Sequence, residues 1–366
     1  MSIYIHIPFC TSICTYCDFC KIYYNKKYID KYLDSLEKEI KERYQGEKVK
    51  TIFIGGGTPT SLDNNELKRL LEITKIFNTE EMIEFTIESN VESVTEDKLK
   101  IMKEYGVNRI SIGVQSFNSE IIKILGRAHT KEEIYSKISL TKKYFDNINI
   151  DLIYAVTENI DIVKEDIDAF LKLNIPHIST YSIIIEDKTI LKINNYQNIE
   201  EDIDYEMYKY IEHTLEDNNY VHYEISNYAK KDYESKHNLV YWNNLEYYGF
   251  GLSSTSYINN IRRTNTKNIT KYLENNYLDE ENYEDKETRI ENEIMLGLRK
   301  VSGLNLDTFK EKYNKELEEL YDISTLLKDK FLIKEDNTLK INKEYIYISN
   351  EILLKILGWH TTTNNL

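Results

Sequence analysis

The chain reads YIHIPFCTSICTYCDFC over residues 4–20, and this stretch holds all four of its cysteines. Cys10, Cys14 and Cys17 follow the spacing C-x-x-x-C-x-x-C, and Cys20 stands three residues further on. Because no cysteine lies elsewhere, there is no long-range disulfide framework, and in a reducing compartment such a cluster is typical of a metal site. Three thiolates on one short loop can hold three corners of a 4Fe–4S cluster and leave the fourth iron open to a chelating cofactor. The spacing leaves two alternatives open, a zinc site or four reduced thiols in a small loop.

Outside this stretch, β-rich runs alternate with stretches of helical apolar spacing, which predicts a parallel sheet with helices outside it. The expected strands are residues 2–7, 51–54, 84–89, 109–114, 147–153 and 177–183. The expected helices are residues 28–40, 67–77, 95–105, 132–144, 161–171 and 203–216.

Length and composition indicate a folded protein of the size of an enzyme. The 366 residues are 41% hydrophobic and include only 12 glycines and 3 prolines, which favours one large core or two modest ones over disorder. A net charge of −15 disfavours nucleic acid as the main partner, because phosphate binding needs a basic surface. No apolar run approaches the roughly 20 residues of a membrane span, and the first residues are too polar for a signal peptide, so we expect a cytoplasmic protein.

Residues 4–20 resemble the cysteine motif of the radical S-adenosylmethionine superfamily, in the branch that contains oxygen-independent coproporphyrinogen III oxidase and the HemW haem chaperones. The likeness extends through several separated motifs along nearly the whole chain. It implies an α/β fold, a partial (β/α)6 barrel open on one side for a large substrate. It also implies that Cys10, Cys14 and Cys17 ligate a 4Fe–4S cluster and that Cys20 is a spare thiol. S-adenosylmethionine would bind the open iron through its amino and carboxylate groups.

Polar motifs follow the expected strands, at the end where α/β barrels carry their chemistry. The resemblance places S-adenosylmethionine against Tyr4, Tyr16, Gly56, Gly57, Thr58, Glu88, Gln115, Arg127 and Asp151. A glycine run also occurs in plain strand-to-helix turns, and a single polar residue is most often a surface group. The recurrence of such residues at successive strand ends therefore favours a ligand site.

Two segments depart from the pattern of the family beside these residues. Ala155-Val156-Thr157 stands where the family has Gly-Leu-Pro, and Val91 replaces the proline of its Glu-x-Asn-Pro motif. Neither change removes a ligating side chain, but both alter the freedom of the backbone. We expect them to affect the binding or cleavage of S-adenosylmethionine and to leave the fold intact.

The second half of the chain contains HNLVYW at residues 237–242, which resembles the HNxxYW motif of the HemW haem chaperones. The resemblance implies that His237, Asn238 and Tyr241 bind haem, and imidazole is a natural axial ligand of haem iron. Taken alone, a histidine in an aromatic segment is most often a packed core residue.

The cysteine motif also differs from that of the oxidase. It begins at Tyr4, without the amino-terminal extension typical of the oxidase. The extra cysteine of the oxidase follows the third ligand by two residues, whereas here Cys20 follows Cys17 by three.

These features favour a haem chaperone that delivers haem to haem proteins such as respiratory enzymes. The alternative is an oxygen-independent coproporphyrinogen III oxidase that makes protoporphyrinogen IX by radical oxidative decarboxylation. A zinc-stabilised interaction module is a third class. The expected partners are haem or another tetrapyrrole and haem-accepting proteins, without nucleic acid. A peripheral membrane contact through those partners and a homodimer are compatible with the sequence.

We expect three parts in the chain. Residues 1–230 form the barrel core, and residues 231–286 form a branch-specific segment with the HNxxYW motif and a linker near residues 259–285. Residues 287–366 form a small α+β, winged-helix-like module with a β-wing at residues 332–341. The slightly acidic charge balance of this module favours a lid or docking surface over DNA binding.

Overall fold

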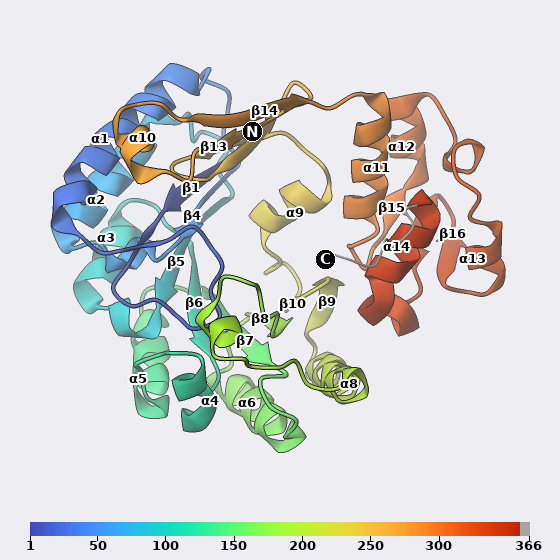
Figure 1. Cartoon of the computed structure of the whole chain (residues 1–366), viewed down its shortest axis with the longest axis horizontal. Coiled ribbons are helices and arrows are strands. Elements are labelled where there is room, and N and C mark those ends of the chain that lie inside the picture. Colours follow the sequence, from blue (N-terminus) through green and yellow to red (C-terminus); the bar gives the residue numbers. More distant parts are fainter. Residues whose placement is uncertain (359–366) are drawn as a thin grey trace.

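The computed structural model describes residues 1–358 and contains one long sheet flanked by helices (Figure 1). The middle of the sheet, in the order β11-β1-β4-β5-β6-β7-β8, is parallel. The six strands expected from the sequence are confirmed as β1 (Ser2–Ile7), β4 (Thr51–Gly56), β5 (Glu84–Asn90), β6 (Arg109–Gln115), β7 (Asn147–Tyr154) and β8 (His177–Ser182).

Each expected helix is also present, on the outer side of the sheet (Figure 1). These helices are α1 (Lys26–Arg43), α2 (Asn64–Ile73), α3 (Glu96–Glu104), α5 (Lys131–Thr141), α6 (Ile160–Leu173) and α8 (Glu201–Asp217). Side-chain caps fix their starts; Asp63, for example, accepts hydrogen bonds from the first turn of α2 in a capping box with Glu66. The chain is thus a partial α/β barrel of the expected class.

Alternation along the strands gives this barrel an apolar outside and a polar inside. Ile110 and Ile112 of β6 are fully buried in the main hydrophobic core. Ser111 lies between them on the opposite face, where the Asn149 amide of β7 donates to its hydroxyl at 2.8 Å. The same amide donates to the hydroxyl of Ser179 on β8 at 3.1 Å. The interior is therefore lined with hydrogen-bonding groups from neighbouring strands.

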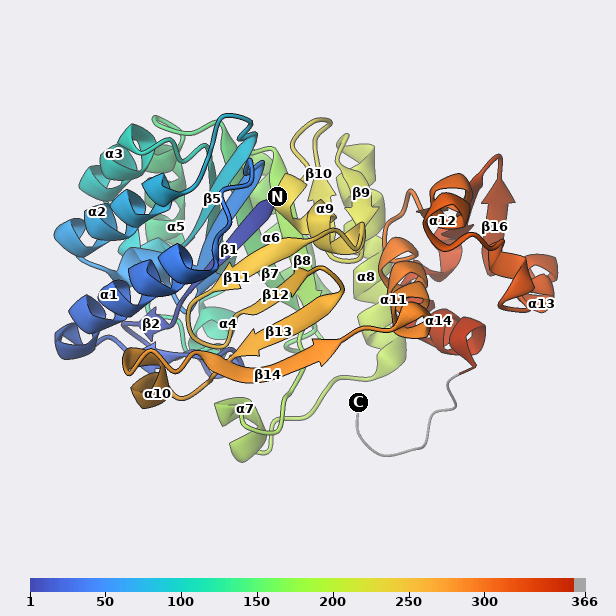
Figure 2. The ribbon, with the colours of Figure 1, turned by 90° about the horizontal axis from the view of Figure 1, so that it is seen from above.

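The segment 259–285, expected to be a linker, is instead part of the main sheet, so that expectation was wrong. β11 (Tyr247–Phe250) pairs in parallel with β1, and β12 (Thr255–Ile258), β13 (Ile261–Asn265) and β14 (Leu278–Tyr283) extend the sheet as an antiparallel meander (Figure 2). Helix α10 (Ile269–Leu273) anchors this meander, because its fully buried Tyr272 donates to Glu39 at 2.8 Å. β14 is exposed along its whole length, so its polar sequence is that of an edge strand.

A second hydrophobic core lies in the carboxyl-terminal part of the chain. It is built by α11 (Lys286–Gly297), α12 (Leu306–Tyr313), α13 (Ser324–Lys328) and α14 (Ser349–Leu357) with a sheet of β15 (Leu304–Asn305), β17 (Thr338–Ile341) and β16 (Leu332–Glu335). β16 and β17 form the expected hairpin, with Asp336 in the left-handed conformation at its turn. Figure 2 shows this part as a separate group of helices beside the barrel.

The remaining elements are short and connect the larger ones. They are β2 (Phe9–Cys10), β3 (Ile22–Tyr23), α4 (Ser119–Ile124), α7 (Ile190–Ile193), β9 (Val221–Glu224), β10 (Asn227–Ala229), α9 (Lys236–Trp242) and the 3-10 turns Pro59–Ser61, Thr74–Ile76, Val91–Ser93, Leu317–Glu319 and Lys343–Ile348. Within residues 1–358, no helix is long and apolar enough to cross a membrane.

Candidate cofactor site

The cysteines lie on a loop that is closed at its base. β2 and β3 pair in parallel, and the amide of Tyr24 donates to the carbonyl of Cys10 at 2.8 Å. At its far side the loop is held by Thr15, whose hydroxyl donates to the Ile124 carbonyl at 2.7 Å and whose carbonyl accepts from Leu191 at 3.0 Å. The loop is therefore held in place by contacts with both α4 and α7.

All four cysteines carry free thiols, with Cys10 buried and the other three half-buried. In the described part of the chain no three His, Cys, Asp or Glu side chains converge as tightly as a single ion requires. A cubane cluster takes each thiolate at a separate iron, so the sulfurs do not have to converge. Burial raises the pKa of Cys10 to about 11 and also raises the pKa of Cys17. Both thiolates therefore need a strongly cationic partner, which a cluster supplies.

Thr58 links the cysteine loop to the strand ends. Its hydroxyl lies 3.7 Å from the sulfur of Cys10 and accepts a hydrogen bond from the Asn90 amide at 2.9 Å. The glycines before it allow this approach. A Cβ at Gly57 would lie 2.8 Å from the backbone of Pro8, and one at Gly56, where φ is +114°, would lie 2.5 Å from the ring of His6. Both glycines are therefore explained by a tight strand-to-helix turn, which was the alternative to a ligand contact. This turn places Thr58 beside Cys10.

Two carboxylates, Glu88 and Asp151, face the barrel interior close to each other. Burial, then the charge of Asp151, raises the pKa of Glu88 to about 8, while the Gly56 amide donates to it at 3.0 Å. Burial also raises the pKa of Asp151, which accepts from the Asn149 amide at 2.8 Å. Such a pair can accept hydrogen bonds from an ammonium or from hydroxyl groups, and a cationic ligand would lower both pKa values.

Gly113 brings three polar side chains together at the end of β6. A Cβ at this glycine would lie 2.5 Å from Nη2 of Arg127, 2.7 Å from Nε2 of Gln115 and 3.1 Å from Oδ1 of Asn90. The Arg127 side chain is only 4% exposed and donates to the Gly113 carbonyl at 3.2 Å, and its Nε finds no hydrogen-bond partner within residues 1–358. A buried guanidinium with an unused donor is suited to a carboxylate ligand. The charge of Arg127 also acts on Tyr16 in the cysteine loop, so Arg127 and the cysteine loop lie at the same end of the barrel.

Sequence reasoning missed the residues that position this group. Glu92 lies 3.9 Å from Arg127 and 3.5 Å from His129, which places a carboxylate behind the guanidinium. Asp166 accepts from the Ser116 hydroxyl at 2.6 Å and from the Phe117 amide at 2.7 Å, and so fixes the turn after Gln115. Burial raises the pKa of Asp166 to about 6. Its signal in the sequence is a carboxylate within the apolar stripe of α6, beside Val163 and Ile167.

One of the two departures from the family pattern, Ala155, has a strained backbone conformation. Ala155 follows β7 in the left-handed conformation, with φ of 60°, and is buried. A residue with a Cβ is strained there, where glycine is not. Val91, the other departure, is fully buried at the start of the Val91–Ser93 turn and packs in the main core.

His237 lies at the other end of the barrel. It contacts Thr51 and Glu84, the first residues of β4 and β5, whereas the glycine turn follows the last residue of β4. At about 3.3 Å per residue, Thr51 and Gly56 lie about 17 Å apart along that strand. The predicted site residues therefore form two groups, most of the cofactor residues toward the carboxyl ends of the strands and the HNxxYW helix α9 at the amino ends, with Tyr4 in the middle of β1 between them.

The imidazole of His237 is enclosed and fully hydrogen-bonded. It is 1% exposed, with Nδ1 2.8 Å from the Thr51 hydroxyl and Nε2 2.8 Å from the Tyr241 hydroxyl. Burial, then the charge of Arg109, lowers the pKa of His237 to about 3, so the ring is neutral. The backbone amide of Asn238 is bonded to the helix-capping Ser235 hydroxyl at 3.3 Å. In this conformation the residues do not fit haem, because neither ring nitrogen is free to bind iron.

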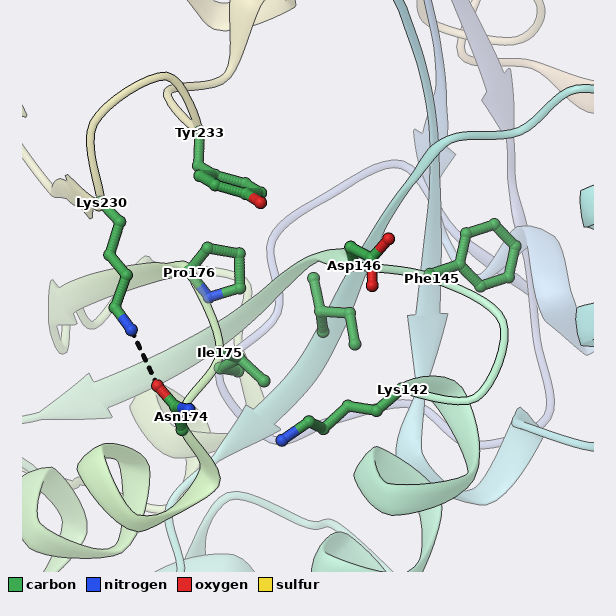
Figure 3. Close-up of a pocket in the computed structure, with 9 residues that line it drawn as sticks. Lys142, Phe145, Asp146, Asn174, Ile175, Pro176, Lys230 and Tyr233 are labelled. Atoms are coloured by element: carbon green, nitrogen blue, oxygen red, sulfur yellow. Dashed lines mark hydrogen bonds between the residues drawn. The ribbon is translucent and has the colours of Figure 1, made fainter.

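A surface pocket of about 260 Å³ is lined by residues at the amino ends of β7 and β8, among them Ile148 and Pro176 (Figure 3). Lys230 and Lys142 line it, but the first donates to the Asn174 side chain at 2.8 Å and the second to the Leu173 carbonyl at 2.9 Å. Both lysines thus bond groups at the end of α6. The pocket brings none of the predicted site residues together.

Comparisons with known proteins agree with this architecture. Residues 4–170 match the radical SAM superfamily and residues 285–347 match the HemN C-terminal domain. The chain is 38% identical to the protein named "Heme chaperone HemW" of Lactococcus lactis subsp. lactis, over 97% of both chains. It is 35% identical to the protein of the same name from Bacillus subtilis, over 98% of this chain and 97% of the relative.

A solved structure shows the same fold. Coproporphyrinogen III oxidase (HemN) from Escherichia coli superposes with a TM-score of 0.86 over 98% of this chain and 90% of that one. The two sequences are 21% identical, so this likeness concerns the fold alone.

Proposed function

The chain belongs to the radical SAM superfamily, in the family of relatives named haem chaperone HemW, and from this premise we propose that it is itself a haem chaperone. It binds a 4Fe–4S cluster, S-adenosylmethionine and haem, and it delivers haem to haem proteins such as respiratory enzymes. The observation that carries this proposal is the identity with the relative from Lactococcus lactis along 97% of the chain.

The cofactor end of the barrel supports the first part of the proposal. Cys10, Cys14 and Cys17 would hold the cluster on their closed loop, with Thr58 beside the first thiol. When bound, the cluster would supply a reducing centre, and its fourth iron, which carries no thiolate, would be the position that S-adenosylmethionine chelates. The carboxylates at the strand ends would accept hydrogen bonds from the amino group and ribose of S-adenosylmethionine, and Arg127 would pair with its carboxylate.

The second part rests on the named relatives and not on the geometry around α9, since His237 is enclosed and both of its ring nitrogens are hydrogen-bonded. Haem binding by this histidine would require the side chain over one ring nitrogen to move. The carboxyl-terminal part is the proposed docking surface for haem-accepting proteins. It meets the barrel where the Val301 amide donates to the Tyr223 carbonyl at 3.1 Å, close to the start of α9.

The experiment is an anaerobic reconstitution of the full chain with iron and sulfide, followed by titration with haem. We expect a 4Fe–4S absorption spectrum, retention of haem through gel filtration, and transfer of that haem to an apo-haem protein. Cys14→Ala should lose the cluster, whereas the matched variant Cys20→Ala should keep it. Failure of the wild-type protein to retain haem would contradict the chaperone function.

The same preparation tests the oxidase. Incubation with coproporphyrinogen III, S-adenosylmethionine and a reductant would yield protoporphyrinogen IX from an oxidase and none from a chaperone. Product formed in repeated turnovers by the wild-type protein would replace our proposal with the enzymatic one. Zinc found without iron or sulfide would contradict both.

A further inference from the structure

Gln115, at the end of β6, has a backbone conformation that glutamine rarely adopts. Its φ is 70°, in the left-handed region. Among the described residues, most of the other non-glycine ones in this region are asparagine or aspartate, which tolerate it, whereas a glutamine is strained there. Such strain persists only where the surrounding structure enforces it, and it is concentrated at ligand sites.

A β-bulge leads the chain into this conformation. Gly113 pairs with Asp151 on β7 and Gln115 pairs with Leu152, so Val114 is an extra residue in β6. Bulges beside binding sites change the direction of a side chain. Here the side chain of Gln115 lies over the strand end, where its Nε2 would be 2.7 Å from a Cβ at Gly113. That position is within the cofactor group.

The side chain of Gln115 does not itself stabilise the strained backbone. The residue is buried, and its side chain makes no hydrogen bond to any group within residues 1–358. The amide is therefore free to donate to a ligand and to accept from one. The left-handed conformation must be enforced by the residues on either side of it.

Asp166, on α6, holds the two residues that follow Gln115. Its Oδ2 accepts from the Ser116 hydroxyl at 2.6 Å, and its Oδ1 accepts from the Phe117 amide at 2.7 Å. Burial raises the pKa of Asp166 to about 6, so the carboxyl group is mostly ionised at neutral pH and both bonds are charge-assisted. Two such bonds to consecutive residues fix the direction in which the chain leaves Gln115.

The residue before Gln115 is held from another direction. Nε2 of His129 lies 3.1 Å from the Val114 carbonyl, and because a carbonyl only accepts, the ring donates. His129 is buried, so this bond is shielded from water. Gln115 therefore lies between two anchored segments, and Asp166 is the anchor that makes two bonds.

We propose that Asp166 is the positioning residue of Gln115, and that its two bonds keep this glutamine left-handed with its amide at the S-adenosylmethionine site. The inference rests on the proposed function for the identity of the ligand. It goes beyond that function by making the affinity for the cofactor depend on a carboxylate of α6 that acts through Gln115.

The experiment is a calorimetric titration of the reconstituted full chain and its variants with S-adenosylmethionine. Asp166→Ala removes both bonds, and we expect about tenfold weaker binding with an unchanged cluster spectrum, because Gln115 then leaves the left-handed region in most unloaded molecules. Asp166→Asn keeps an oxygen for the Phe117 amide and should lose only about threefold. Asp168→Ala removes an exposed carboxylate of the same helix; it is the matched control and should bind as the wild type does.

A double-mutant cycle separates positioning from a general loss of structure. In the Gln115→Ala background, Asp166→Ala should change the affinity by less than about twofold, because the residue that it positions is already gone. A further loss of about tenfold in that background would show that Asp166 acts through other groups, and would overturn the inference. If Asp166→Ala does not fold, Asp166→Asn takes its place, and its smaller loss should vanish in the same background.

A second measurement needs no cofactor. NMR of the unloaded protein should give a positive φ for Gln115 in the wild type and in Asp168→Ala, and a negative φ in Asp166→Ala. A φ that stays positive without Asp166, or an affinity of Asp166→Ala equal to that of the wild type, would refute the positioning role while leaving cofactor binding intact. Wild-type protein that carries its cluster and binds no S-adenosylmethionine would instead refute the proposed function and, with it, the role of Gln115 toward that ligand.

Discussion

Replacing Gly113 by alanine tests whether the side chains at the end of β6 form the cofactor site. A Cβ at this position would lie 2.5 Å from Nη2 of Arg127, against an ordinary contact of at least 3.4 Å, so the guanidinium must retreat by about 0.9 Å. It would have to do so while only 4% exposed and with its bond to the Gly113 carbonyl at 3.2 Å. Nε2 of Gln115, 2.7 Å from the added atom, must move as well.

The displacement should cost the charge-assisted contact of Arg127 with the carboxylate of S-adenosylmethionine. Such hydrogen bonds contribute about 1.5–3 kcal/mol, and a loss of about 2 kcal/mol corresponds to roughly 30-fold weaker binding. The cysteine loop is held by separate bonds from Thr15, so the cluster should assemble normally. Gly113→Ala is therefore expected to bind S-adenosylmethionine about 30-fold more weakly with an unchanged cluster spectrum.

The assay is calorimetric titration of anaerobically reconstituted protein with S-adenosylmethionine. Gly106→Ala is the control, because that glycine has φ of +85° and no atom within 4 Å of an added Cβ. It should lose about 1 kcal/mol of stability through backbone strain and keep its affinity. Affinity of Gly113→Ala within twofold of the wild type, with the cluster intact, would show that Arg127 and Gln115 do not contact the cofactor.

Three further changes test other parts of the structure. Ala155→Gly should raise the free energy of unfolding in urea by about 0.5–1 kcal/mol by relieving the left-handed strain, and an unchanged midpoint would contradict that strain. Glu84→Ala should destabilise the protein by about 3 kcal/mol because it leaves the buried amides of α9 unpaired; an equal loss in the exposed control Glu80→Ala would contradict the capping role. The pKa of Glu88 is raised from 4.5 to about 8, so the free energy of unfolding should fall by about 5 kcal/mol as pH rises through that range; Glu88→Gln should flatten the profile, and a parallel profile would refute the assignment.

The parallel core of the fold is predictable from the sequence because each strand is amphipathic in a regular way. Ile110 and Ile112 enter the main core while Ser111 faces inward, and the other strands of the barrel repeat this pattern. The meander β11–β14 is not predictable in this way. β14 has the sequence LDEENY and is exposed throughout. It forms a strand because its backbone pairs with that of β13. An edge strand made by tertiary context carries no periodic signal of its own.

The site shows the same division between local and distant causes. The candidate site residues in the cysteine motif and beside the glycine turn could be predicted from the sequence, because each belongs to a short motif. Asp166 could not, because its partners Ser116 and Phe117 lie about fifty residues earlier and meet it only when the fold brings α6 to the turn that follows β6. The two ends of the barrel were also inseparable in the sequence. Only the register, with Thr51 at one end of β4 and Gly56 at the other, separates His237 from the cofactor group.

The acidic side chains at those two ends are compensated differently. Glu84 is satisfied at the amino end, where it accepts hydrogen bonds from the first turn of α9. Within the described residues, Glu88 and Asp151 at the carboxyl end have no basic partner at ion-pair distance, and Arg109 acts on both only at longer range. Burial without a counter-charge is why the pKa values of both acids are raised. A cationic ligand group at that end would remove this cost, so ligand binding should stabilise the carboxyl ends of the strands and leave α9 unchanged.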